Sequence, residues 1–530
     1  MKALLMYRDR DFTTQQSLPW KYNARQRPKR EVLLASYLWN APALAQDLEL
    51  DKLLYAMAGD DDFVFEVAQK AIFTGLQNDR DTVLYRQAVL RDALKNKAVV
   101  RELYGLLRTV DEETRRNWWG LSTRYPSTML YSATDLLEGL LVTLRNLRKI
   151  AEAHRAEFES EGFIAFFRML ERELGEEYLD QIQNHLKELR FRKGVLLSAE
   201  LGESNESVQL TLREPPANEQ GWFARIFSKG PPAYTFHLAE RDEAGGQIIS
   251  NLRHRGITRV ALAVAQSADH VLGFLGILRT EVAFYVACLN LHDVLTAKNL
   301  PTCFPLPQQE TDRKHAFQGL HDISLALSMN GNVVSNTANA DGKSLIIVTG
   351  ANQGGKSSFL RSLGLAQMMM QCGMFVAAEE FSAGLCTALF THYKREEDTT
   401  MKSGKFDEEL ARINEIVEHV VPNALFLFNE SFAATNEREG SEIAEQIVRA
   451  LLEKRTKIFY VTHLFAFASH FSNQKSADCL FLRAERKPDG VRTFRIVEGG
   501  PLETSYGEDL YHEIFAAKAE NAIDTRSLDK

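Results

Sequence analysis

Apolar residues recur at helical spacing over most of the first part of the chain. Between about 30 and 185 they repeat every three or four residues, as in Leu136-Leu137-x-x-Leu140-Leu141, with charged residues at the intervening positions. This period places the apolar side chains on one face of a helix and the charged ones on the other. The pattern predicts an all-helical region.

A different pattern begins near residue 195. Val195 to Leu201 and Val208 to Leu212 are typical of two short strands joined by a turn. Helical periodicity returns near Ile248 and continues to about Ala297, a length for which we expect a kink or break near Gly256. A helix leading out, a small β insertion over 194–240 and a long returning helix together predict an arm with a tip.

From Ser344 onward the chain contains short, continuous apolar runs. They are Ser344 to Val348, Ala424 to Phe428 and Lys457 to Val461, and helical patterns separate them. Such runs are typical of strands that are buried on both faces of a mainly parallel sheet. The last part of the chain is therefore predicted to form an α/β domain.

One glycine-rich segment lies between the first of these strands and a predicted helix. Its residues, Gly350-Ala351-Asn352-Gln353-Gly354-Gly355-Lys356-Ser357, fit the P-loop pattern G-x-x-x-x-G-K-[ST]. Glycine lets the backbone curl so that its N–H groups face phosphate oxygens, and the following helix adds a partial positive charge. Lys356 is expected to reach the β and γ phosphates of ATP, and Ser357 to ligate Mg²⁺. The alternative interpretation is a purely structural turn.

Polar residues also follow the other two predicted strands. Asn429 and Glu430 come after Ala424 to Phe428, and Glu430 is placed to polarise an attacking water. Asn429 stands where an aspartate is expected, and its neutral amide lacks the charge that favours Mg²⁺, so hydrolysis is predicted to be slow. His463 follows the last strand and is expected to sense the γ-phosphate. The alternatives are a solvated carboxylate for Glu430 and a structural hydrogen bond for His463.

Taken together, these patterns predict a multidomain protein. An all-α core and lever region with a small β insertion is followed by an α/β P-loop NTPase domain. The expected divisions are an N-terminal segment over 1–30, the helical core and lever arm over 31–300, the ATPase domain over 301–515 and a C-terminal tail over 516–530.

Composition and charge narrow the possible partners. The 530 residues carry a net charge of −8, which excludes a globally basic nucleic-acid coat and leaves only a local basic surface. The five cysteines are scattered without a CxxC pair, which indicates free thiols in a reducing compartment and no zinc spacing. No signal peptide or continuous apolar span is recognisable. We therefore expect a cytoplasmic protein with no membrane partner.

The segment Thr349 to Ser358 resembles the T-G-P-N-M-G-G-K-S-T loop of the MutS family of DNA mismatch-repair ATPases. Further similarities follow in the family's order. They are Phe390-Thr391 at F-T, then Asp398, Ser403, Phe406 and Glu409, then Asn429-Glu430 at D-E, Thr435-Asn436-Glu437-Arg438-Glu439-Gly440 at T-S-T-Y-D-G, Thr462-His463 at T-H and Ser505-Tyr506-Gly507 at S-Y-G. The resemblance is specific over about 315–515 and looser over about 30–300.

This resemblance implies a MutS/ABC-like ATPase with ATP and Mg²⁺ as cofactors. Glu430 and His463 would be catalytic, and Ser357, Asn429 and Glu430 would hold the metal. The family's architecture also implies a homodimer through the ATPase domain, in which Thr435 and Asn436 reach the partner subunit's nucleotide. The residues that would hold the nucleotide are Gly350, Ala351, Asn352, Gln353, Gly354, Gly355, Lys356, Ser357 and Ser358.

The chain also departs from full-length MutS. About 345 residues precede the P-loop, too few for the mismatch-recognition and connector domains, so we expect a shortened MutS-related protein that lacks the mismatch-recognition domain. The expected function is ATP-dependent DNA binding, in which ATP binding and slow hydrolysis switch a dimer on DNA in a repair or recombination-type role.

The predicted arm is only mildly basic. Residues 186–260 contain 11 basic and 9 acidic residues, and Arg190, Arg192 and Lys193 are the densest basic cluster. Contacts from the arm to DNA phosphates are one interpretation, and a solvated charged surface is the other. The alternative function is a nucleotide-switched protein-interaction module that does not bind DNA. An SMC-type ATPase would need an L-S-G-G-Q motif and long heptad arms, which the sequence lacks.

Overall fold

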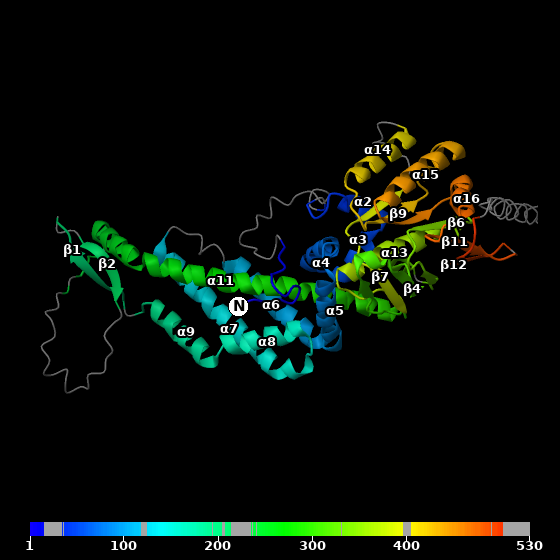
Figure 1. Cartoon of the computed structure of the whole chain (residues 1–530). Coiled ribbons are helices and arrows are strands. Elements are labelled where there is room, and N and C mark those ends of the chain that lie inside the picture. Colours follow the sequence, from blue (N-terminus) through cyan, green and yellow to red (C-terminus); the bar gives the residue numbers. More distant parts are fainter. Residues whose placement is uncertain are drawn as a thin grey trace, which may run out of the picture.

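The computed structural model describes residues 1–14, 34, 36–117, 125–192, 194–203, 207–213, 235, 237–239, 241–329, 331–395, 404–488 and 490–501. Figure 1 shows an elongated molecule with an α/β domain at one end and a small β-hairpin at the other. Helices connect the two ends. The predicted combination of a helical region with an α/β domain is confirmed, while the exact domain boundaries stay predictions.

The first half of the described chain is helical. Its helices bury apolar stripes against one another, and several begin at a capping aspartate, such as Asp61, whose carboxylate accepts from Phe63 N and Val64 N. The helices are α2 (Ala41–Asp47), α3 (Leu50–Ala58), α4 (Asp62–Gly75), α5 (Arg80–Lys95), α6 (Lys97–Asn117), α7 (Pro126–His154), α8 (Glu161–Glu173), α9 (Glu176–Leu189) and α11 (Glu243–Ala297), with a 3₁₀ turn η5 (Arg155–Glu157) after α7.

The longest helix, α11, runs from the tip of the arm to the α/β domain (Figure 1). Of the kink or break expected near Gly256, the break is wrong, because the helix continues through this residue. Gly256 serves packing instead: a Cβ there would lie 2.4 Å from Leu197 Cδ2 of the hairpin. By length and composition α11 could cross a membrane, but 78% of its most apolar 18-residue window is buried inside the protein. Its apolar side chains are therefore used as a core.

The tip of the arm is a two-stranded antiparallel sheet. Strands β1 (Leu196–Leu201) and β2 (Ser207–Arg213) pair with Leu197 opposite Leu212. This confirms the predicted hairpin. Residues 214–234 of the predicted insertion lie outside the described residues, as does Lys193.

The α/β domain is built on a six-stranded sheet. The strand order is β12-β11-β6-β10-β9-β8, and all neighbours are parallel except β11 and β12. The strands are β6 (Leu345–Gly350), β8 (Leu389–Tyr393), β9 (Leu425–Asn429), β10 (Lys457–Val461), β11 (Cys479–Arg486) and β12 (Arg492–Glu498). The three predicted apolar runs are thus confirmed as β6, β9 and β10.

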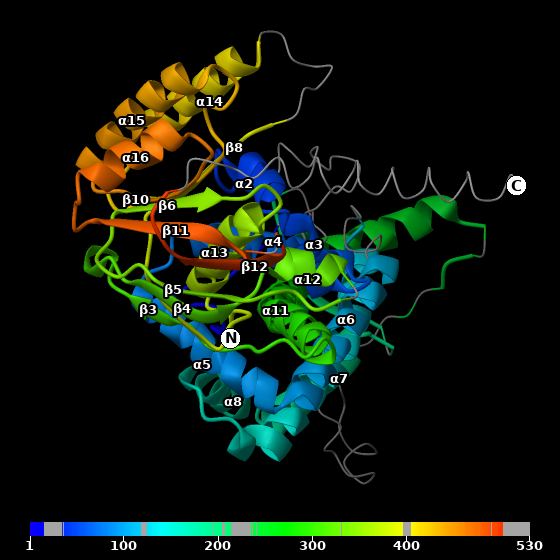
Figure 2. The same cartoon turned by 90° about the vertical axis from the view of Figure 1, so that its right-hand side faces the viewer.

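Helices cover both faces of this sheet. Figure 2 shows α14 (Lys405–Glu418), α15 (Glu437–Glu453) and α16 (Phe465–Asn473) on one side and α13 (Lys356–Gln371) on the other. A second sheet of order β3-β7-β4-β5 lies beyond α13. Its strands are β3 (Leu306–Gln308), β4 (His315–Leu320), β5 (Asn336–Asn339) and β7 (Glu380–Gly384), with a short 3₁₀ turn η6 (Glu310–Asp312) before β4 and a short helix α12 (Ile323–Ser328) between β4 and β5.

The first fourteen residues are part of the core. Leu5 N and Phe12 N donate to the carboxylate of Glu281 on α11 at 2.6 and 2.9 Å. Arg86 on α5 donates from Nε to Met6 O at 2.9 Å and from Nη1 to Cys372 O, at the end of α13, at 3.3 Å. Burial raises the pKa of Glu281 to about 7. The N-terminal residues therefore link the base of the arm helix to the helix that begins at the glycine-rich segment.

Candidate nucleotide-binding site

The glycine loop, residues 350–355, joins β6 to α13 as predicted. Gly350 and Gly355 have left-handed backbones, with φ of +109° and +87°. A Cβ on Gly350 would lie 2.9 Å from Ala484 N of β11, and one on Gly355 would lie 3.2 Å from Phe494 O of β12. The loop thus needs glycine both for its conformation and for its contact with the β11–β12 hairpin.

Lys356 is the first residue of α13, and it is buried. Its Nζ donates to Gly350 O at 3.0 Å and to Ala351 O at 2.9 Å. Burial lowers the pKa of Lys356 to about 8, while the nearby Glu430 carboxylate raises it and the charge of Arg492 lowers it. The ammonium group is therefore held inside the loop by backbone carbonyls, where a phosphate oxygen would be a stronger partner.

Residues from three separate segments meet beside this lysine. Ser357 Oγ donates to Asn429 Oδ1 at 3.1 Å, and His463 Nε2 lies 3.0 Å from Glu430 Oε1. The hydrogen bond from His463 holds the pKa of Glu430 below its ordinary value, with help from the charges of His463, Lys356 and Lys394, although burial acts the other way. The structure thus brings the predicted residues together and keeps Glu430 as a carboxylate.

The donor set suits Mg²⁺ only in part. The Ser357 hydroxyl and the Asn429 amide oxygen are hard oxygen ligands in mutual contact. The carboxylate of Glu430 lies beside them and lines the cavity, and it already faces His463. The described residues contain no group of three or more His, Cys, Asp and Glu side chains suited to a metal. Phosphate oxygens of a nucleotide would have to complete the coordination.

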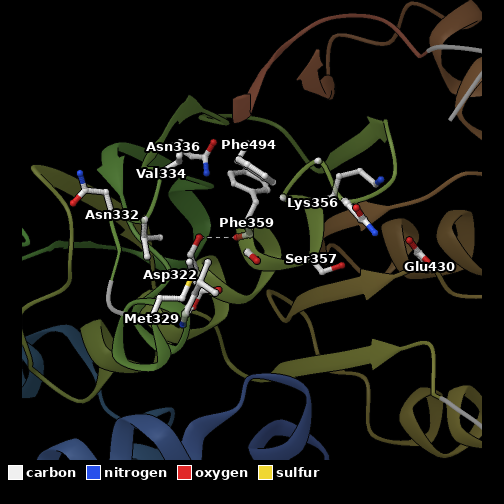
Figure 3. Close-up of a pocket in the computed structure, with 17 residues that line it drawn as sticks. Asp322, Met329, Asn332, Val334, Asn336, Lys356, Ser357, Phe359, Glu430 and Phe494 are labelled. Carbon is white, nitrogen blue, oxygen red and sulfur yellow. Dashed lines mark hydrogen bonds between the residues drawn. The ribbon is translucent and has the colours of Figure 1, made fainter. Parts of the chain in front are cut away.

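A cavity of about 430 Å³ extends from the glycine loop toward β5 and α12. Figure 3 shows Lys356, Ser357 and Glu430 at one end, Met329 and Asn332 at the other, and the Phe494 ring between them. The residues that line it are Asp322, Leu325, Met329, Asn332, Val333, Val334, Asn336, Gln353, Gly354, Gly355, Lys356, Ser357, Ser358, Phe359, Ser362, Glu430 and Phe494.

Sequence reasoning missed the far half of this cavity. The Phe494 side chain comes from β12, is 49% exposed and has a left-handed backbone with φ of +60°. Aromatic rings of this kind stack on nucleobases. Asp322 and Asn336 help to shape the same end: Asp322 forms an ion pair with Arg361 of α13, and Asn336 Oδ1 accepts from Ile496 N of β12. Phe494 and Asp322 belong to no motif, so the sequence alone carried no signal for them.

Other predicted residues lie apart from the cavity. Thr435 and Asn436 stand at the start of α15, where Asn436 Oδ1 accepts from Glu439 N at 3.0 Å and Thr435 donates to Glu439 Oε2 at 2.8 Å. Neither lines the cavity of its own chain. Asn352 also does not line it, whereas Ala351 contributes its carbonyl to Lys356.

Some of the positions that carry the resemblance lie on α14 or beyond the described residues. Phe406 and the buried Glu409 lie on α14. Asp398, Ser403 and Ser505 to Gly507 lie outside the described residues.

Comparison with known proteins agrees with this architecture, in which a helical region with an arm precedes a mixed α/β domain. The model of the MutS2 N-terminal domain matches residues 78–298, and that of MutS domain V matches residues 346–520. The chain belongs to the MutS family, and the two matched regions are consistent with a member that lacks the mismatch-recognition domain.

Individual relatives support the same assignment. MutS protein homolog 4 of Homo sapiens is 31% identical over 204 residues, which cover 37% of this chain and 22% of the relative. DNA mismatch repair protein MutS of Thermus aquaticus is 30% identical over 167 residues, which cover 31% of this chain and 20% of the relative. Endonuclease MutS2 of Thermus thermophilus is 31% identical over 160 residues, which cover 30% of this chain and 21% of the relative. The matched part thus spans about a fifth of these relatives.

We expect nucleotide binding to depend on the charge of Lys356 and to take up a proton. Because its pKa is about 8 in the free protein, much of the charge is absent near pH 9, and an adjacent polyphosphate restores it. Calorimetry of ATP binding near pH 9, in two buffers of different ionisation enthalpy, should show uptake approaching roughly one proton per site.

The matched control is Lys356→Arg, which keeps a permanent charge and should abolish the uptake. Lys356→Ala should weaken ATP binding roughly 100-fold, as expected when a charged hydrogen bond worth about 3 kcal/mol is removed. Wild-type binding without proton uptake, or an unchanged affinity in Lys356→Ala, would show that the phosphates bind elsewhere.

Proposed function

We propose that the protein binds ATP with Mg²⁺ at the glycine loop and hydrolyses it slowly, as a P-loop NTPase of the MutS/ABC-like class. The observation that carries this proposal is the buried Lys356 ammonium, whose two hydrogen bonds go to backbone carbonyls in the middle of the loop. A buried ammonium that is hydrogen-bonded only to neutral groups is costly, and a phosphate chain is the anion that such a loop fits.

The surrounding residues suit a phosphoryl-transfer site. Lys356 supplies a point charge to the β and γ phosphates, and Ser357 with Asn429 would hold Mg²⁺, which neutralises the developing charge when bound. Glu430, kept ionised by His463, positions and deprotonates the attacking water. His463 would respond to the γ-phosphate through its hydrogen bond with Glu430. The neutral Asn429 limits the metal's affinity, so turnover is slow.

Glu430→Gln should separate binding from hydrolysis. The amide keeps the size of the side chain but cannot accept the proton of the water, so kcat should fall at least roughly 100-fold while ATP affinity changes little. Steady-state phosphate release and equilibrium ATP binding measure the two quantities. The companion change Asn429→Asp should raise kcat by strengthening Mg²⁺ placement. Hydrolysis by Glu430→Gln at the wild-type rate would disprove the role of Glu430.

The relatives suggest where this ATPase acts. Two of the relatives carry DNA mismatch repair or endonuclease in their names. We propose that ATP switches a homodimer on DNA in a repair or recombination-type role. The exposed start of α15, with Thr435 and Asn436, is the surface that would complete the partner's site. All five cysteines are free thiols, in keeping with a cytoplasmic location.

The arm is the proposed DNA-binding part, and the structure changes which of its residues are the best candidates. Arg190 forms ion pairs with Glu138 at 2.6 Å and with Asp135 at 3.3 Å, so its charge is largely compensated. The side chains of Arg192, Arg253 and Arg259 are exposed near the hairpin. They are better placed to contact phosphates than Arg190.

Replacing Arg192, Arg253 and Arg259 together with Ala should weaken DNA binding regardless of sequence. The slope of log affinity against log salt concentration should become less steep by up to about 3, which is one unit for each phosphate that is no longer neutralised. The matched control replaces Lys2, Lys149 and Arg168, which are exposed basic residues away from the hairpin. ATP hydrolysis without DNA should be unchanged in both triple variants.

The same titration decides between the two functions. The alternative is a nucleotide-switched protein-interaction module, which the weak charge of the arm and the pairing of Arg190 favour. ATP binding together with no DNA binding at low salt would support that alternative. An unchanged salt slope in the arm variant would place the DNA contact elsewhere.

A further inference from the structure

Arg492, the first residue of β12, points its guanidinium at the glycine loop. Its Nη1 donates to Gln353 Oε1 at 3.2 Å. Its Nε and Nη2 are shielded from solvent, and neither has a hydrogen-bond partner in the described part of the chain. Leaving charged donors buried and unsatisfied is costly, so a position of this kind is expected to receive an acceptor.

Among the described residues, no carboxylate forms an ion pair or hydrogen bond with the Arg492 guanidinium. Glu485, on the neighbouring strand, accepts a hydrogen bond from Thr493 Oγ1 at 2.8 Å. The residue paired with Arg492 across the hairpin is Arg486, which has the same charge. Lys356 lies near enough that the positive charge of Arg492 lowers the pKa of the lysine. An anion between Lys356 and Arg492 would turn this repulsion into attraction.

The backbone holds Arg492 in place. The β11–β12 hairpin packs against the glycine loop so closely that a Cβ on Gly354 would lie 2.7 Å from Ala484 Cβ. Two residues beyond Arg492, Phe494 lines the same cavity as Lys356 and Ser357. The strand that carries Arg492 therefore forms one wall of the proposed nucleotide site.

We propose that Arg492 is a second cationic ligand of the nucleotide phosphates, supplied by the same chain. Its side chain exchanges the amide oxygen of Gln353 for phosphate oxygens, which a guanidinium binds with two parallel N–H groups. This assignment rests on the proposed ATP site and adds to it a residue that no motif contains. The added charge offsets the carboxylate missing at Asn429, because it binds the polyphosphate without relying on the metal.

The test compares ATP and inorganic tripolyphosphate binding in the wild-type chain and in Arg492→Ala, Arg492→Lys and Arg495→Ala. Arg495 is exposed on the same strand and serves as the matched control. Arg492→Ala should weaken binding of both ligands roughly 10- to 100-fold. Arg492→Lys keeps the charge but not the two parallel N–H groups, so it should recover part of the loss, and Arg495→Ala should match the wild type. The loss should be larger still in EDTA, where no metal shares the phosphate charge.

The outcomes separate this inference from the proposed function. One outcome would overturn the role of Arg492 alone. In it, the wild type and Arg492→Ala bind ATP equally well, whereas Lys356→Ala does not bind it. A loss in Arg492→Ala that Arg492→Lys does not restore at all, with a lowered melting temperature, would show a structural role and also overturn it. Wild type that binds neither ATP nor tripolyphosphate would overturn the nucleotide site itself.

Discussion

The close packing of the glycine loop against the β11–β12 hairpin determines the geometry of the whole site. Gly350 and Gly354 leave no room for a Cβ beside Ala484, so the loop backbone is pressed against the neighbouring strand. The same contact brings Phe494 of β12 to the cavity and Arg492 to the glycine loop. A larger residue at position 350 or 354 would push this wall away and separate the two halves of the site.

A second set of contacts joins this site to the arm. Helix α13 begins at Lys356, beside the glycine loop, and ends near Cys372, whose carbonyl accepts from Arg86. Arg86 also holds Met6, and the same N-terminal residues are bound by Glu281 of α11. One continuous chain of packed elements therefore runs from the proposed nucleotide site to the helix that extends to the hairpin. A network of this kind is a physical route for coupling between the two ends of the molecule.

The features that could be predicted from the sequence are those that short motifs and the order of strands determine. The strand, loop and helix around Lys356 follow from a short motif, and Glu430 and His463 follow from parallel strands that end at one edge of a sheet. Arg492 and Phe494 could not be predicted, because they reach the site only through the pairing of β11 with β12. The role of Gly256 also depends on a tertiary contact. Its lack of a side chain makes room for Leu197 of the hairpin, and the helix is not broken there.

Hydrogen–deuterium exchange of the full chain, with and without a non-hydrolysable ATP analogue and Mg²⁺, tests the central claim most directly. The loop and the hairpin form one wall around one ligand, so the account predicts slower exchange at residues 350–357 and at 492–496 together. Unchanged exchange in residues 350–357 at saturating analogue would contradict the nucleotide site. Protection of the loop without any change in 492–496 would contradict the part assigned to the hairpin.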